Sequence, residues 1–271
     1  MKLKEFCRGI RLAPEALQVV EKMDEEISEI RYQYIREVFW VDQKKMFREI
    51  SAAPGYRQRF LYYYCRLACE TYEEYQQRNI GEKVFFDTFS DISLWCDVCF
   101  RRYGEYGLQE YEWLWRHIKM ALFRLGRFQF ERMSSEWEFI WNGTSVKKGD
   151  TVISIHIPEG DPITQEKCLE SLKKGQEFWK MAVPYLCHSW LLYPGLQNLL
   201  GETSNIRRFQ KLFDIAGTDY KYREGEERIF GMLLDDPSGY PEYTRLQKEA
   251  KKYLEKGGKL GSGLGILKDL I

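Results

Sequence analysis

Two of the three histidines in this chain, His156 and His188, lie in segments that read as neighbouring β-strands. The first segment is TVISIHIPEG (residues 151–160), a helix-forming stretch follows, and the second segment is YLCHSWLL (residues 185–192). Two strands joined through a helix are expected to run parallel, and open sheets bind ligands at the carboxyl ends of such strands. Because imidazole titrates near neutral pH, both histidines are candidates for general acid–base catalysis.

Alternation along each strand predicts which of these side chains share a face. His156 shares a face with Ser154, opposite a row of isoleucines that we expect to pack on the following helix. On the second strand, His188 and Ser189 point to opposite faces. Whether the two histidines lie on the same side of the sheet depends on the register of the strands, which the sequence does not determine.

Three other interpretations of this region remain open. Each histidine could be a structural residue in a half-buried strand. His156, His188 and Glu159 in the adjoining loop could bind zinc in a metal-dependent hydrolase, but their spacing matches no common zinc motif, and we expect no bound metal. Ser189 beside His188 could be a nucleophile, although the chain has no Gly-x-Ser-x-Gly elbow and no evident acid partner for it.

Four cysteines form a second group that could do chemistry. Cys96 and Cys99 are spaced C-x-x-C, and Cys65 and Cys69 are spaced C-x-x-x-C on an earlier predicted helix. Four thiolates on neighbouring helices could hold zinc. All four lie mid-helix among aromatic residues, so packing in a core is the favoured interpretation.

Asp87 and Asp91 lie one helical turn apart and could serve a metal or a substrate amine. A solvated helix face or a local cap is the more common role of such a pair.

Composition narrows the classes of function. The chain has 271 residues, with 41 Lys+Arg against 41 Asp+Glu, and this balance argues against non-specific nucleic-acid binding and against a polybasic membrane anchor. No long apolar run predicts a transmembrane helix, and the N-terminus does not resemble a signal sequence. The seven cysteines imply no disulfide framework, so we expect a reduced, cytoplasmic protein whose oligomeric state the sequence leaves open.

The chain changes character near Arg124, which predicts an α+β protein of two domains, 1–123 and 124–271. The first domain reads as helices, including one over residues 108–125. The second reads as strands with a few helices, and Asn142-Gly143 predicts a hairpin turn. Within it we expect strands at residues 214–222 and 228–234, a helix at 243–255, and a flexible glycine-rich connector at 257–265.

Five spaced runs resemble a known family. They are FSDISLWCD (residues 89–97), RLGRFQFE (124–131), IHIPEG (155–160), CHSWLLYP (187–194) and SNIRRFQKLF (204–213). They are similar to those of bacterial two-domain acyltransferase proteins, in which a helical N-terminal domain precedes a GNAT-like domain. The resemblance covers nearly the whole chain and implies a mixed β-sheet with flanking helices in the second half.

The resemblance also implies a donor substrate, acetyl-CoA or another acyl-CoA. In the GNAT fold the backbone of the corresponding strand bonds the pantetheine arm, and amides at the start of the next helix hold the pyrophosphate. The matching residues here are Ile157, Gly160, Ile163 and Thr164. The loop reads PEGDPITQ and lacks the usual Gln/Arg-x-x-Gly-x-Gly/Ala signature, and its acidic residues would repel a pyrophosphate unless they point away.

The implied reaction is acyl transfer to a small-molecule or peptide amine. The strand around His188 would splay from its neighbour and admit the thioester, and Glu159 or His188 would deprotonate the amine. A backbone amide of the first strand would polarise the thioester carbonyl. The alternative is a non-catalytic ligand-binding or interaction protein that keeps the same fold.

Overall fold

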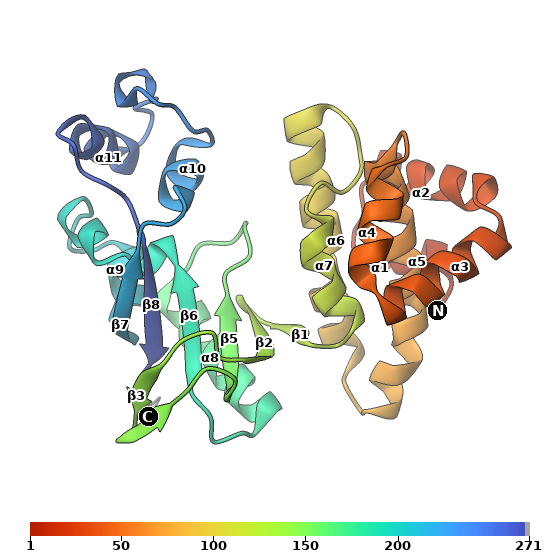
Figure 1. The fold of residues 1–271 in the computed structure, drawn as a ribbon, viewed down its shortest axis with the longest axis horizontal. Coiled ribbons are helices and arrows are strands. Elements are labelled where there is room, and N and C mark those ends of the chain that lie inside the picture. The colour runs from red at the N-terminus through yellow and green to blue at the C-terminus, as the bar shows by residue number, and fades with distance from the viewer. Residues whose placement is uncertain (269–271) are drawn as a thin grey trace. The chain divides into compact units, whose positions relative to one another are not determined.

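The computed structural model describes residues 1–268. The chain divides into two compact units, Met1–Leu125 and Gly126–Ile271 (Figure 1). Helices make up almost all of the first unit, and the second combines a mixed β-sheet with flanking helices, as the sequence predicts. Within residues 1–268, no helix has both the length and the apolar character needed to cross a membrane.

The first unit contains seven helices and one short strand among its described residues. They are α1 (Leu3–Gly9), α2 (Pro14–Glu26), α3 (Glu29–Val41), α4 (Gln43–Ser51), α5 (Tyr56–Gln77), α6 (Glu82–Tyr103), α7 (Tyr111–Ile118) and β1 (Leu122–Leu125). Local signals set several helix ends: Pro14 occupies the first turn of α2, and the Ser28 hydroxyl accepts a hydrogen bond from the Arg31 N–H of α3. Helix α5 supplies much of the core, including the buried side chains of Phe60 and Tyr64.

The predicted helix over residues 108–125 is confirmed only for Tyr111–Ile118, and its extension to residue 125 is wrong. Helix α7 ends at Ile118, Met120 adopts a left-handed conformation with φ of 52°, and the chain continues as strand β1. The apolar spacing of this stretch suits a helix, but a non-glycine residue at positive φ cannot continue one.

The second unit is built around a sheet whose strands within this unit follow the order β2-β5-β6-β8-β7. They are β2 (Phe128–Ser134), β5 (Thr151–His156), β6 (Tyr185–Ser189), β7 (Phe213–Asp219) and β8 (Ser262–Leu267). Strands β5 and β6 pair in parallel, as expected of strands joined through helix α8 (Gln165–Trp179), and the other neighbouring pairs are antiparallel. A separate hairpin, β3 (Phe139–Trp141) and β4 (Thr144–Val146), turns at Asn142-Gly143 as predicted, with positive φ at both residues.

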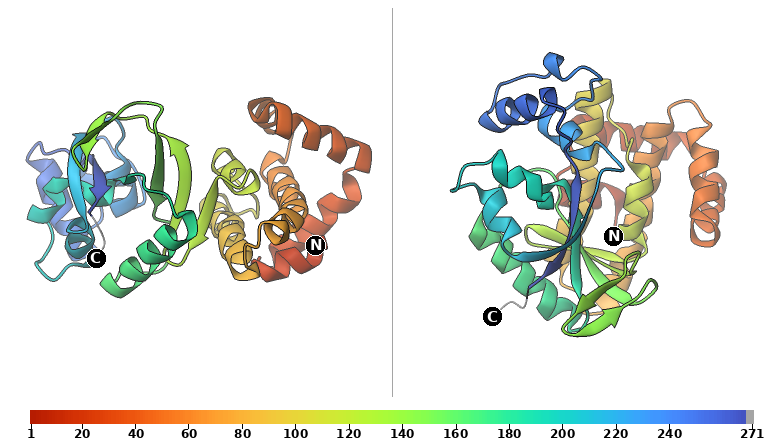
Figure 2. Two further views of the ribbon diagram at one scale, coloured as in Figure 1. Left: turned by 90° about the horizontal axis from the view of Figure 1, so that it is seen from below. Right: turned by 60° about the vertical axis from the view of Figure 1, so that its left-hand side comes forward.

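Helix α8 and the β3–β4 hairpin cover opposite faces of the sheet (Figure 2). On the α8 face, the Tyr185 hydroxyl donates to the Gly175 carbonyl of α8 at 3.4 Å, and Tyr185 pairs in register with Ile153. The isoleucine face of β5 therefore packs towards α8. The opposite face holds a cluster of Val152, Leu186, Leu264 and hairpin residues.

Two sequence expectations in the second unit are wrong. Residues 228–234 are not a strand, because they lie in and just after helix α10 (Glu224–Phe230), which ends at Gly231 with φ of 75°. The glycine-rich stretch at 257–265 is no flexible connector, because its second half forms β8 inside the sheet. A Cβ on Gly263 would lie 2.2 Å from the Leu192 carbonyl oxygen, so glycine is needed where another chain segment crosses the strand closely.

The remaining elements lie between β6 and β8. They are the short 3₁₀ helices η1 (Trp190–Leu192), η2 (Pro194–Asn198) and η3 (Pro237–Gly239), and the helices α9 (Asn205–Gln210) and α11 (Arg245–Glu255). The Gln210 amide donates to the Leu191 and Tyr193 carbonyls at 2.8 and 3.1 Å, which fixes the segment after β6. Helix α11 is the predicted 243–255 helix, and a capping box of Thr244 and Gln247 sets its start.

Candidate active site

Strands β5 and β6 are paired over a short stretch only. Their ladder joins Ile153 to Tyr185 and Ser154 to Leu186, although β5 continues to His156 and β6 to Ser189. Beyond the second pair the strands separate towards their carboxyl ends, the end where ligands bind in open sheets. The extended backbone of β5 lies on one side of this opening and that of β6 on the other. A ligand in the opening can form the backbone hydrogen bonds that the two strands would form with each other in a continuous sheet.

The register places His156 and His188 on the same face of the sheet. Ser154 pairs with Leu186, and each histidine follows its paired residue by two positions, so both side chains point to the side of Ser154 and Leu186. The two imidazoles thus stand at the same level, one on each side of the opening. This answers the question of register that the sequence left open.

His188 forms a hydrogen-bonded pair with a carboxylate. Its Nε2 lies 2.6 Å from Asp219 Oδ2 at the end of β7, and its ring lies 5.7 Å from the Trp137 ring, centroid to centroid. The His188 side chain is 31% exposed, so it is open to solvent. Partial burial alone would raise the pKa of Asp219, but hydrogen bonds from the Lys221 N–H and from His188 outweigh it and hold that pKa below its usual value.

His156 faces a second carboxylate. Its Nε2 lies 2.9 Å from Oε2 of Glu131 on β2, whose side chain is only 8% exposed. Gln129 pairs directly with His156 in the antiparallel register and is almost fully buried. The Gln129 Nε2 has no hydrogen-bond partner among the described residues, so this end of the sheet face carries an unsatisfied donor.

Ser189 and Cys187 lie on the opposite face from His188. The Ser189 hydroxyl accepts a hydrogen bond from the Leu191 N–H at 3.2 Å and so caps η1. Burial raises the pKa of the Cys187 thiol well above its usual value. This geometry gives Ser189 a structural role in the turn after β6 and does not direct its hydroxyl to the His188 ring.

The loop from β5 to α8 contains the residues predicted to bind the cofactor. Gly160 has a φ of 113°, a conformation that favours glycine, and the Thr164 hydroxyl accepts from the Lys167 N–H at the start of α8. Asp161 forms an ion pair with Lys167 at 2.8 Å, which offsets one of the acidic charges of the loop. The loop thus leads into the partial positive charge of a helix start, although the Lys167 N–H there is already bound to the Thr164 hydroxyl.

One carboxylate lies at this helix start. Hydrogen bonds from the backbone N–H of Glu166 itself and from the Thr164 hydroxyl lower the pKa of Glu166. An anion bound to the first turn of α8 would meet this negative charge.

The third histidine, His117, belongs to a buried group in the first unit that the sequence reasoning missed. Its Nε2 lies 3.1 Å from Oδ2 of Asp91, which also accepts a hydrogen bond from the Trp113 indole N–H at 2.8 Å. Asp91 is 1% exposed, so its interpretation as part of a solvated face is wrong, whereas Asp87 is partly exposed and pairs with Lys83. The apolar setting of Asp91, between Phe89 and Ile92, was the available signal of burial.

The cysteines pack as reduced residues. All seven are free, and six of them are buried. Burial raises the pKa of both Cys69 and Cys96 to about 12, which keeps these thiols protonated at neutral pH. Within residues 1–268, no three His, Cys, Asp or Glu side chains converge as a metal site would require, so the zinc arrangement of His156, His188 and Glu159 is not assembled.

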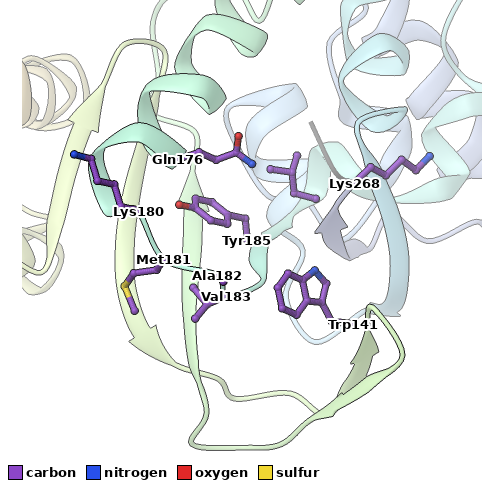
Figure 3. Close-up of a pocket in the computed structure, with 9 residues that line it drawn as sticks. Trp141, Gln176, Lys180, Met181, Ala182, Val183, Tyr185 and Lys268 are labelled. Carbon is purple, nitrogen blue, oxygen red and sulfur yellow. The ribbon is translucent and has the colours of Figure 1, made fainter. Parts of the chain in front are cut away.

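A pocket of about 330 Å³ lies at the other end of β6, beside Tyr185 (Figure 3). Its lining is mostly apolar and includes Trp141, Met181 and Val183. The ammonium groups of Lys180 and Lys268 extend away from its centre in this view. Because Tyr185 begins β6 and His188 is near its end, this pocket is separate from the histidine pairs.

Glu131 and Asp219, the carboxylates that meet the two histidines, were not predicted as site residues. Glu131 follows buried residues in the alternating run RFQFERM, and Asp219 lies within the predicted strand at residues 214–222. An acidic residue in a strand is a weak signal by itself. Its partner becomes identifiable only when the order of the strands is known. Asp219 lies 31 residues after His188 in the sequence, and its strand β7 is next to β6 only through β8.

Comparison with known families finds two consecutive matches. The family described as "N-acyltransferase N-terminal domain" matches residues 1–120, and the family described as "GNAT-like C-terminal domain" matches residues 122–267. No curated protein matches the chain significantly.

Solved structures show the same fold. One is an acyltransferase in complex with decanoyl-CoA and teicoplanin, with a TM-score of 0.75, and another is an acyltransferase mutant in complex with octanoyl-CoA, with a TM-score of 0.76. A third, an acyltransferase in complex with CoA and 10C-teicoplanin, has a TM-score of 0.75. Each is 18% identical to this chain, and the alignments cover 97% of this chain and 86% of the other.

Proposed function

Because this chain belongs to the family that joins an N-acyltransferase N-terminal domain to a GNAT-like C-terminal domain, we propose that it transfers an acyl group from an acyl-CoA to an amine. The observation that carries the proposal is the opening between β5 and β6, with a histidine–carboxylate pair on one face of the sheet beside it. Such an opening gives a thioester access to strand backbone and to a base at the same time.

The donor site is the β5–α8 loop. The acyltransferases of the same fold were crystallised with decanoyl-CoA, octanoyl-CoA or CoA, and an acyl-CoA of eight to ten carbons is therefore our first choice of donor. In this proposal the backbone at Ile157 bonds the pantetheine arm, while Gly160, Ile163 and Thr164 surround the pyrophosphate at the start of α8. The ion pair of Asp161 with Lys167 removes part of the repulsion expected from the loop sequence.

His188 is the proposed general base. Asp219 orients its ring through Nε2, which leaves Nδ1 to accept the proton of the attacking amine. The amine nitrogen bonds to the thioester carbon, the carbon–sulfur bond breaks, and a backbone N–H at the end of β5 stabilises the carbonyl oxygen. Glu159 is the weaker candidate for the base, because it is exposed in the loop.

The acceptor approaches on the histidine face. Trp137 lies against the His188 ring, and Tyr220 and Tyr222, just after Asp219, are 53% and 64% exposed. Exposed aromatic side chains beside a base favour an acceptor with an apolar or aromatic body. Two of the acyltransferases with this fold were crystallised with teicoplanin or 10C-teicoplanin, which supports an amine on a large molecule as the class to test.

We also propose that the protein acts in the cytoplasm. Its seven cysteines are all free, as expected of a protein in a reducing compartment.

A ligand-binding experiment tests the donor site. The melting temperature is measured with free CoA, acetyl-CoA, octanoyl-CoA and decanoyl-CoA, because any ligand of the native state stabilises it by about 2.7 kcal/mol at one hundred times its Kd. We expect a dose-dependent rise that is largest for the longer acyl chains. Equal melting temperatures with and without every one of these compounds would contradict the proposal.

Release of CoA then separates catalysis from binding. Octanoyl-CoA and decanoyl-CoA are incubated with a panel of primary amines and with hydroxylamine, and free thiol is measured. Binding without thiol release under any condition would favour the alternative of a non-catalytic binding protein.

A further inference from the structure

We propose that His156 is a second catalytic residue of this site, the general acid that protonates the departing thiolate of coenzyme A. This inference rests on the proposed function and assigns a separate task to each histidine. His188 takes a proton from the incoming amine, and His156 delivers a proton to the leaving sulfur.

The two histidine–carboxylate pairs stand on either side of the opening. The last pair between β5 and β6 joins Ser154 to Leu186. His156 lies two positions after Ser154, and His188 lies two positions after Leu186. Both side chains therefore point to one face at the same level, from strands that are about 4.8 Å apart where they are still paired. A thioester lying in the opening has one imidazole on each side, as a reaction with one proton acceptor and one proton donor requires.

The carboxylates differ in a way that assigns the roles. The side chain of Glu131 is 8% exposed, whereas that of Asp219 is 43% exposed. A buried carboxylate stabilises a neighbouring positive charge more strongly than an exposed one, because water screens it less. The buried Glu131 therefore favours His156 as the group that gives a proton, and the more exposed Asp219 leaves His188 as the group that takes one. Opposed environments for two titratable groups are the usual sign of an acid–base division.

Gln129 supports the same assignment independently. It is the direct cross-strand partner of His156 and lies on the same face. It is 1% exposed, and its Nε2 donor has no hydrogen-bond partner in the described part of the chain. A buried donor without a partner costs free energy, and a group with negative charge beside His156, such as a thiolate, would satisfy it.

The step balances in atoms and charge. The amine nitrogen forms a bond to the thioester carbon, and the bond from that carbon to sulfur breaks with its electron pair on sulfur. His188 receives one proton from the nitrogen, and His156 gives one proton from its Nδ1 to the sulfur. The products are an amide and CoA thiol, and exchange with water returns both imidazoles to their starting states.

The test compares two donors that differ in their need for a proton. Decanoyl-CoA releases a basic alkyl thiolate, whereas the 4-nitrothiophenyl thioester of decanoic acid releases a weakly basic aryl thiolate that needs no acid. Hydroxylamine is the acceptor in both cases, and rates above the enzyme-free reaction are expressed as kcat/KM of the variant relative to the wild type. This ratio cancels the weaker binding of the smaller donor.

For His156→Gln we expect a loss of about 10²- to 10³-fold with decanoyl-CoA, the usual size of a general-acid contribution, and a loss below about fivefold with the aryl thioester. His188→Gln is the matched control: its loss should be the same with both donors, because its proton comes from the acceptor. Melting temperature and the Kd for decanoyl-CoA should stay near the wild-type values in His156→Gln, which excludes misfolding and lost binding.

Two results would overturn the assignment. One is an equal loss for His156→Gln with both donors, which would mean a positioning role. The other is an unchanged rate with decanoyl-CoA. If the wild-type protein consumes neither donor, the proposed function itself is contradicted. This result is obtained before any variant is made, so it is distinguished from a failure of the His156 assignment. For His156→Ala, added imidazole should restore turnover of decanoyl-CoA. This rescue is a second test of proton donation by the His156 side chain.

Discussion

His188 Nε2 and Asp219 Oδ2 lie 2.6 Å apart, across a sheet in which β8 separates their two strands. A hydrogen bond to Nε2 selects one tautomer of the imidazole and orients the ring. This pair supports the proposal of proton transfer at the end of the sheet next to the opening, and it leads to the first two predictions.

Replacing Asp219 with Asn should lower kcat by about 10- to 100-fold and leave the Kd for acyl-CoA unchanged. The loss is smaller than the ~10⁴-fold effect at a buried triad aspartate, because Asp219 is 43% exposed and water can partly replace it. Steady-state kinetics measure the effect. Asp214→Asn, on the same strand with a side chain 75% exposed, is the control and should retain wild-type kinetics. A rise in KM for the donor with no change in kcat would show that Asp219 acts on binding instead.

The same pair predicts a pH dependence of stability. The pKa of Asp219 is lowered in the folded protein from its ordinary value of 3.8, so the folded state favours the charged carboxylate. Its contribution to stability is fully present above that ordinary value and is lost as the pH falls through the lower folded pKa. Urea unfolding of the wild type and of Asp219→Asn should therefore differ at pH 6 and converge near pH 2. A difference that is constant over this range would rule out the ionised pair as its source.

Replacing Glu166 with Gln should tighten the binding of acyl-CoA by about two- to fivefold, the usual effect of one charge at a helix start. The Glu166 carboxylate lies at the first turn of α8, where the proposed pyrophosphate site is located. Isothermal titration with CoA gives the affinity. Glu177→Gln, at the far end of the same helix, should leave the affinity unchanged. If both variants bind as the wild type does, the pyrophosphate does not lie at this helix start.

Gly263→Ala should destabilise the second unit by about 1–3 kcal/mol or more, as expected of overpacking against backbone. The new Cβ would lie 2.2 Å from the Leu192 carbonyl oxygen, which cannot rotate away as a flexible side chain can. Gly217→Ala on the neighbouring strand is the matched control, because its Cβ would meet nothing within 4 Å. Urea denaturation compares the two. Equal stability of both variants would mean that η1 shifts without cost.

Tyr240→Phe should cost about 1–3 kcal/mol, because it removes a buried hydroxyl that is hydrogen-bonded to the Leu234 N–H, the Glu226 carboxylate and the Arg223 guanidinium. That hydroxyl accepts from the Leu234 N–H at 2.9 Å and donates to the buried Glu226 carboxylate at 3.0 Å. Tyr243→Phe, at a side chain 91% exposed, should change the free energy of unfolding by less than about 0.5 kcal/mol. Thermal unfolding of the two variants measures this difference. Equal melting temperatures would show that water replaces the Tyr240 hydroxyl.

The sequence was enough to predict which strands and which histidines form the candidate site. The alternation in TVISIHIPEG identified β5 and the face of His156, and the intervening helix required β6 to run parallel to it. The same kind of reasoning failed at residues 257–265, because glycine signals flexibility unless one knows that another segment crosses it. Leu192, more than 60 residues earlier in the chain, supplies that reason.

What the sequence by itself determined is therefore local: the two classes of domain, the strand–helix–strand unit, the Asn142-Gly143 turn, and the two histidines as candidates. These follow from side-chain periodicity and from hydrogen bonding over a few residues. Only the tertiary structure decided that His156 and His188 share a face, that their strands separate, and that Glu131 and Asp219 are their partners. Register and strand order set these relationships, because a shift of one residue would turn each histidine to the other side of the sheet.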